Sequence, residues 1–121
     1  FYESLGWHLI DKTDHFRLFE TRGSRLALFP QALLDKDAGV QGVDGTPRMT
    51  LAINLSSEEE VDAAFLDLER IGATITKPPH ETFWGGYSGY FQDPDGFLWE
   101  IAYNPFIDLD FSRQYEDTHG V

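Results

Sequence analysis

Hydrophobic and polar residues alternate in short runs along the first 30 positions of the chain. Runs at 7–11, 16–21 and 25–30 are rich in aromatic and aliphatic residues, and turn-forming residues separate them. This pattern predicts three antiparallel strands. Residues 1–6 are typical of a helix that ends at a glycine. The chain starts in the middle of that helix, so we expect further residues of the natural protein upstream of Phe1.

The clearest amphipathic segment covers residues 57–72, where the spacing predicts a helix. Ser57 and Glu60 form a capping-box pattern at its start, and Gly72 provides a stop signal at its end. One face is apolar at the helical period, so we expect that face to pack on the sheet. The apolar stripe consists of Val61, Ala64, Phe65 and Leu68.

Four further strands are predicted around this helix, at residues 49–55, 73–77, 86–92 and 97–103. Pro78-Pro79 is expected to end the second of them, because proline cannot donate to a strand ladder. The last two strands form a hairpin whose turn is Asp93-Pro94-Asp95-Gly96. Glycine at the last turn position fits a positive φ.

The strand at 49–55 has two different faces. Met49, Leu51, Ile53 and Leu55 share one face, which we expect to be core. Thr50, Ala52 and Asn54 share the other face, which is small and polar and suits solvent or a cavity.

The element order predicts an α+β fold of paired βαβββ modules, whose sheets form a half-barrel with a concave pocket. This arrangement requires one strand upstream of Phe1, missing from the sequence as given. A faint internal repeat supports the pairing, because Leu5-Gly6 ends the first helix as Ile71-Gly72 ends the second. The predicted single domain covers residues 1–103, and its parts are module 1 at 1–30, an irregular linker at 31–47, module 2 at 48–103 and then an acidic tail at 104–121.

The composition of the chain disfavours some classes of binding partner. Nine basic residues against 21 acidic ones give a net charge of −12, which disfavours nucleic acid and anionic membranes. The chain has no cysteine, so disulfides and thiolate metal sites are excluded, and a cytoplasmic location is compatible with this. No apolar run approaches the roughly 18 residues of a membrane span. Aromatic residues make up 15% of the chain, enough to line a pocket as well as a core.

Three segments carry a family resemblance. Residues 1–7, FYESLGW, resemble the FYxxLGF segment of the vicinal-oxygen-chelate superfamily, the glyoxalase, bleomycin-resistance and extradiol dioxygenase group. Residues 50–55 resemble that superfamily's fifth strand. Residues 90–101, YFQDPDGFLWEI, resemble its closing hairpin, YFxDPDGxxWEL. The resemblance implies the paired-module fold and a ligand cavity, but it does not fix one reaction, since fold and function are separable.

The resemblance also implies a test for metal binding. Many enzymes of that group hold one divalent metal, and Glu100 matches their closing ligand. Their fifth-strand ligand position is Thr50 here, a poor ligand, and the first-module position falls on Ala27 or Leu28. We therefore expect no metal and no cofactor. The alternative is a metal-dependent lyase, isomerase or dioxygenase that uses Glu100 with ligands upstream of Phe1.

The preferred interpretation is a small-molecule-binding protein, and whether it is an enzyme stays open. Glu100 is the best catalytic candidate, as an acid or base. Strand alternation places Tyr87 and Tyr90 on opposite faces, so only one of them can point into the pocket. The alternative for the aromatic residues is structural packing between modules or across a dimer. We also expect a homodimer, because open sheet edges need partners. The predicted ligand-contacting residues are Thr50, Asn54, Trp84, Tyr87, Tyr90 and Glu100.

Overall fold

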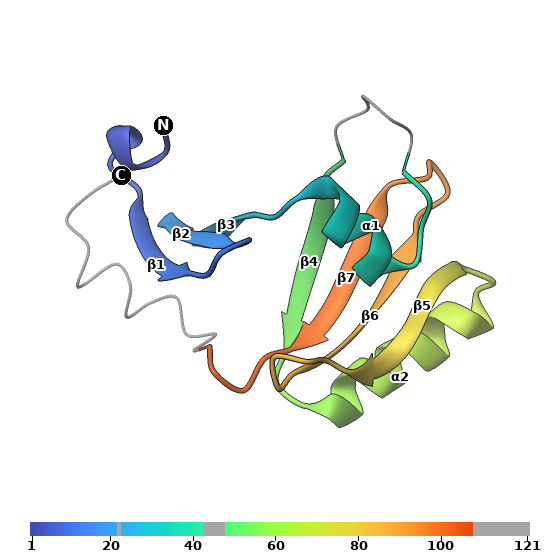
Figure 1. The fold of residues 1–121 in the computed structure, drawn as a ribbon. Helices are drawn as coiled ribbons and strands as arrows, with labels where there is room; N and C mark the ends of the chain where they lie inside the picture. The colour runs from blue at the N-terminus through green and yellow to red at the C-terminus, as the bar shows by residue number, and fades with distance from the viewer. Residues whose placement is uncertain (22, 43–47, 108–121) are drawn as a thin grey trace. The chain divides into compact units, whose positions relative to one another are not determined.

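The computed structural model describes residues 1–21, 23–42 and 48–107 (Figure 1). The chain divides into two compact units, with the boundary between Leu33 and Leu34. Each unit is described by itself. The fold is mixed α+β, as predicted, and each unit contains one open sheet.

The first unit is a three-stranded antiparallel sheet in the order β1-β2-β3. A short 3-10 helix, η1 (Glu3–Leu5), precedes the sheet and ends at Gly6, whose φ is +87°. Glycine tolerates this conformation because it has no Cβ. The core residue of this sheet is Phe19, which is 6% exposed and lies against the Tyr2 ring. The strands are β1 (His8–Lys12), β2 (Arg17–Thr21) and β3 (Ser24–Leu28).

The second unit contains a complete βαβββ module. Its sheet has the order β4-β7-β6-β5, in which β4 runs parallel to β7 and the other neighbours are antiparallel. The predicted order of elements is therefore confirmed for this module. Its elements are β4 (Thr50–Leu55), α2 (Glu58–Arg70), β5 (Thr74–Glu81), β6 (Tyr87–Gln92) and β7 (Leu98–Tyr103).

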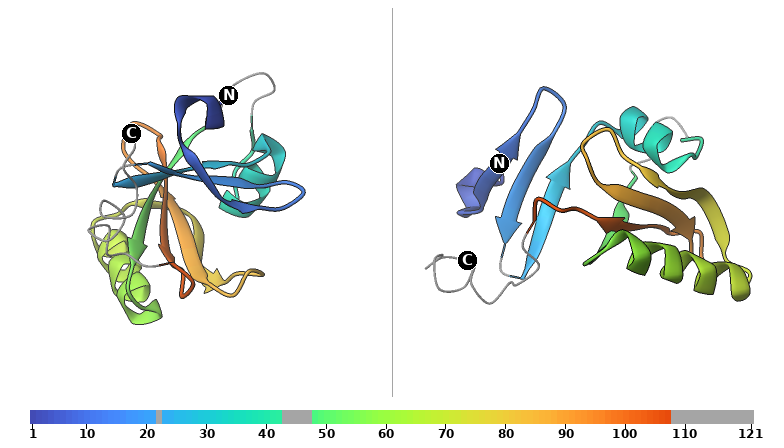
Figure 2. Two further views of the ribbon diagram at one scale, coloured as in Figure 1. Left: turned by 90° about the vertical axis from the view of Figure 1, so that its left-hand side faces the viewer. Right: turned by 90° about the horizontal axis from the view of Figure 1, so that it is seen from below.

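Helix α2 begins as its sequence predicts. The Ser57 hydroxyl accepts a hydrogen bond from the Glu60 amide at 3.1 Å, and the Glu60 carboxylate accepts one from the Ser56 amide at 2.8 Å. The first bond satisfies an amide that the first helical turn leaves without a partner, and the second ties that turn to the residue before the N-cap. The predicted stripe lies against one face of the sheet, where Val61 and Phe65 pack with Ile101 (Figure 2).

The prediction of an irregular linker was wrong for its first half. Residues 31–38 form a helix, α1 (Gln31–Ala38), which lies on the face of the second sheet opposite α2 (Figure 2). The segment is composed largely of strong helix formers, and Gly39, with a φ of +71°, ends the helix. Tertiary contacts with residues distant in sequence then stabilise this short helix.

The predicted end of β5 was also wrong. This strand continues through Pro78 and Pro79 to Glu81. It is an outer strand of its sheet, so one side needs no ladder hydrogen bonds, and its register with β6 shifts between Lys77 and His80. Prolines are tolerated at such edge positions and bulges.

The expectation that one whole face of β4 is core does not hold. Met49 is 71% exposed, Leu51 is 44% exposed and Ile53 is 40% exposed, whereas Leu55 is half-buried against α2. The physical reason is position: β4 is the other outer strand, and α2 lies mainly over β5, β6 and β7.

Candidate functional site on the face opposite α2

The side of the second sheet opposite α2 contains buried polar side chains and a glutamate whose pKa is raised. Register pairs Tyr90 on β6 with Glu100 on β7, and Glu100 with Ala52 on β4. Cross-strand partners project their side chains to the same side of a sheet. We call this side the Glu100 face and define it by Ser88, Tyr90, Leu98, Glu100 and Ala102.

Tyr90 lies at the centre of the Glu100 face and is 3% exposed. Its hydroxyl donates a hydrogen bond to Oδ2 of Asp37 in α1 at 2.6 Å. Glu100 is the cross-strand partner of Tyr90 on β7, and its charge acts on this hydroxyl. Burial, followed by the charge of Glu100, raises the pKa of Tyr90 far above its ordinary value, so the phenol keeps its proton.

Glu100 is half-buried, and burial raises the pKa of its carboxyl group. Burial has this effect because a low-dielectric environment penalises the charged form. The negative charge of Asp37 raises this pKa further, whereas the Tyr90 hydrogen bond and the nearby His80 act in the opposite direction. Glu100 thus binds a proton more readily than an exposed glutamate does, which suits it to hydrogen bonding or proton transfer.

Ser88 and His80 extend the face toward β5, where the two residues are register partners. Ser88 is fully buried, and its hydroxyl has no hydrogen-bond partner among the described residues. His80 is half-buried, and its Nδ1 lies 2.9 Å from the carbonyl oxygen of Pro78. A carbonyl can only accept, so Nδ1 carries a proton, and Nε2 is an acceptor in the neutral ring and a second donor in the charged ring.

The structure places the predicted site residues of β4 on the Glu100 face. Thr50 pairs with Leu98 and Asn54 pairs with Ala102, so both follow the parity that the sequence predicted. Asn54 is exposed, however, and the Thr50 hydroxyl donates to the carbonyl oxygen of Leu98 at 3.1 Å. These two side chains border Glu100 along the outer strand.

Tyr87 lies on the other face of the second sheet, and Trp84 lies in the turn between β5 and β6. Tyr87 packs in the α2 cluster, and its hydroxyl donates to Asp62 of α2 at 2.6 Å, a bond that raises its pKa to about 12. Tyr87 and Tyr90 therefore occupy opposite faces, as alternation predicted, and Tyr90 is the one beside Glu100. The half-buried Trp84 ring lies over its own turn, where a Cβ added to Gly86 would be 2.0 Å from it.

Sequence reasoning missed Asp37 and gave no role to Ser88. Asp37 was assigned to a linker, and it reaches Tyr90 only because α1 folds back onto the sheet. Ser88 had a usable signal, because it shares strand parity with Tyr90 and follows a glycine pair in an aromatic segment. Of the four histidines, His8 and His15 are exposed, and His119 lies outside the described residues.

The described residues supply only part of the ligand set with which the superfamily that the chain resembles holds a metal. Within residues 1–21, 23–42 and 48–107, no group of three or more His, Cys, Asp or Glu residues is arranged to hold a metal ion. Thr50 directs its hydroxyl proton to a backbone carbonyl, and Ala27 and Leu28 contribute no donor atoms. A single carboxylate provides too few ligands for tight binding.

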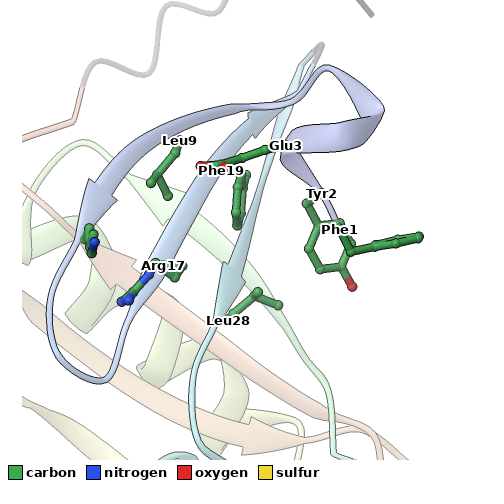
Figure 3. Close-up of a pocket in the computed structure, with 8 residues that line it drawn as sticks. Phe1, Tyr2, Glu3, Leu9, Arg17, Phe19 and Leu28 are labelled. Atoms are coloured by element: carbon green, nitrogen blue, oxygen red, sulfur yellow. The ribbon is translucent and has the colours of Figure 1, made fainter.

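The first unit contains a separate hollow of about 340 Å³ (Figure 3). Its lining includes Leu9 and Phe19, which are register partners. In the second unit, the matching register pair is Ile75 and Phe91, and α2 covers it. The hollow therefore lies on the side of the first sheet that corresponds to the α2-covered side of the second sheet. It does not lie on the side that corresponds to the Glu100 face. Its other lining residues are Phe1, Tyr2, Glu3, Lys12, Arg17 and Leu28.

No helix in the described part of the chain has the length and apolarity that crossing a membrane requires.

Comparison with known proteins gives a consistent family match. The family model described as "Glyoxalase/Bleomycin resistance protein/Dioxygenase superfamily" matches residues 1–101. A comparison with curated proteins found no match. Among solved structures, a glyoxalase-related enzyme from Fulvimarina pelagi is 33% identical over 83% of this chain and 72% of that chain, with a TM-score of 0.47.

Two more distant structures show likeness of fold alone. A structure described as NAD-dependent benzaldehyde dehydrogenase from Legionella pneumophila is 22% identical and covers 84% of this chain and 82% of that chain, with a TM-score of 0.64. The Mn(II)-bound glyoxalase from Novosphingobium aromaticivorans is 21% identical and covers 82% of this chain and 31% of that chain, with a TM-score of 0.54.

Proposed function

This chain belongs to the Glyoxalase/Bleomycin resistance protein/Dioxygenase superfamily, and on that premise we propose that it binds a small organic molecule against its Glu100 face. The observation that carries the proposal is the Ser88 hydroxyl, fully buried without a partner among the described residues, on the same face as the desolvated Glu100. Buried polar groups in native proteins are normally hydrogen-bonded. A ligand with polar atoms would supply the partner that Ser88 lacks.

The chemistry of the face favours a neutral or cationic ligand with a hydrogen-bond donor. Glu100 and Asp37 are both acceptors when ionised, whereas Tyr90 supplies only one proton between them. The net charge of −12 also attracts cations at long range. Thr50 and Asn54 would contact the ligand along the outer strand, and Trp84 would contact it from the β5–β6 turn.

Replacing Glu100 with glutamine is expected to weaken ligand binding by about 10- to 100-fold, the range for losing a hydrogen bond to a charged group. Aromatic and antibiotic-like compounds would be screened by thermal shift, and the affinity of each hit would then be measured by calorimetry. Glu69→Gln is the control, because Glu69 is exposed on α2. Hits that bind Glu100→Gln and the original chain equally well would contradict this assignment.

The protein is expected to contain no stoichiometric divalent metal. Thr50, Ala27 and Leu28 occupy positions at which metal-binding relatives need donor atoms, so Glu100 has no matching ligands in the part of the chain that the structure describes. Elemental analysis of the purified natural full-length protein is the measurement. Zinc, iron, nickel or manganese near one atom per chain, lost on Glu100→Ala, would overturn this expectation and support the metal-dependent alternative.

We also propose that the protein is a homodimer. Along β4, the outer edge has no strand partner among the described residues, and Met49, Leu51 and Ile53 expose apolar surface beside it. An open edge with apolar side chains favours pairing with another chain. Sedimentation of the natural full-length protein should give twice the mass of one chain, and a monomer at all concentrations tested would refute the proposal.

A further inference from the structure

Helix α1 covers part of the face to which we assign ligand binding. Ala38 is completely buried against Tyr90 and Leu98, and Leu34 and Val40 pack at the margin of the same cluster. Figure 1 shows α1 lying across the strands, and its Asp37 is hydrogen-bonded to Tyr90. A ligand that reaches Tyr90 therefore meets α1 first.

The attachment of α1 to the sheet is limited. The helix has eight residues, fewer than the roughly 12–15 that an isolated helix needs for marginal stability in water. Its one fully buried side chain is the small Ala38. Asp35 forms an ion pair with Arg48, which follows α1 in the chain and lies outside the sheet strands. Among the described residues, the side-chain hydrogen bond from α1 to the sheet is thus the one between Asp37 and Tyr90.

The hydrogen bond between Asp37 and Tyr90 lies close to a second carboxyl group, that of Glu100. Asp37 on α1 accepts the one proton that the Tyr90 hydroxyl can donate, and Glu100 on β7 is the cross-strand partner of Tyr90. The basic side chain near Glu100 is His80 on β5, which lowers the pKa of the Glu100 carboxyl group. When Glu100 is ionised, it competes with Asp37 for the same proton and repels the Asp37 carboxylate. A ligand that bonds to Tyr90 or Glu100 would take the place of Asp37.

We propose that α1 is a displaceable cover of the Glu100 face, held by the hydrogen bond between Asp37 and Tyr90 and released when a ligand takes its place on Tyr90. The competing ligand is the small organic molecule of the proposed function, so this proposal rests on that function. It also gives Asp37 a role in ligand affinity, because part of the binding energy is used to displace α1.

The chain contains a matched control for this bond. Tyr87 donates to Asp62 of α2 at 2.6 Å, the same distance as in the bond between Tyr90 and Asp37. Helix α2 has 13 residues and buries Val61 and Phe65, so it does not depend on its tyrosine bond for docking. Asp37→Ala and Asp62→Ala thus each remove a tyrosine–aspartate bond of 2.6 Å, the first partly buried and holding a short helix, the second exposed and on a longer helix.

Hydrogen exchange on the whole chain, followed by mass spectrometry, tests the cover without any ligand. In the original chain, the amides of residues 34–40 should exchange faster than those of β6. Asp37→Ala should speed exchange at 34–40 by about tenfold, the effect of one lost hydrogen bond. Alanine favours helix, so this loss would report undocking and not poorer helix propensity. Asp62→Ala should leave exchange at residues 61–70 unchanged.

A second measurement follows access to Glu100 directly. Carbodiimide with glycine ethyl ester labels carboxyl groups that solvent can reach, and Asp37→Ala and Tyr90→Phe should both increase labelling at Glu100. Exchange at 34–40 as slow as in β6, or unaffected by Asp37→Ala, would overturn the proposal. If instead α1 opens as expected and no screened compound depends on Glu100, then the proposed function fails while the displaceable helix stands.

Discussion

Replacing Phe65 with alanine is expected to lower the free energy of unfolding of the second unit by about 3–5 kcal/mol, the usual range for a buried aromatic residue. Phe65 is 3% exposed and packs with Val61 and Ile101 between α2 and the sheet. Its removal leaves a cavity that neighbouring strands cannot fill without moving. Urea unfolding followed by circular dichroism measures the loss.

Leu66 provides the control for this prediction. It is the next residue of α2 but is 60% exposed, so Leu66→Ala should change the free energy of unfolding by no more than about 0.5 kcal/mol. Equal losses for the two variants would mean that α2 does not pack on the sheet through the Phe65 side.

Replacing Gly89 with alanine is expected to destabilise the same unit by about 1–3 kcal/mol, the cost of overpacking a core. A Cβ at Gly89 would lie 2.6 Å from Cζ of Phe65 and 2.9 Å from the backbone oxygen of Lys77. The ring is able to shift, whereas the backbone oxygen of a paired strand is held in place. Urea unfolding again gives the free energy.

The double variant Phe65→Ala/Gly89→Ala separates these two contacts. Removing the ring relieves one clash, so the combined loss should be smaller than the sum of the single losses by about 0.5–3 kcal/mol, as for residues in contact. Strictly additive losses would show that the ring of Phe65 does not approach Gly89 in solution.

The sequence was sufficient for the elements that depend on short-range patterns. Helix α2 follows from its capping box and apolar period, and the last hairpin turn follows from Gly96, whose φ is +85°. Alternation also assigned Tyr87 and Tyr90 to opposite faces, and it placed Thr50 on the side of Glu100. These features require only local periodicity, because side-chain direction in a strand or helix is fixed by the backbone.

Only the tertiary structure determined which elements cover which surfaces. The exposed face of β4 and the continuation of β5 through Pro78 both result from outer positions in the sheet, and strand order is not encoded in either segment alone. Helix α1 docks through Asp37, whose partner Tyr90 lies 53 residues away in sequence. Contacts at that separation leave no periodic pattern in the sequence, so the chemistry around Glu100 became visible only when α1 and the sheet were in place.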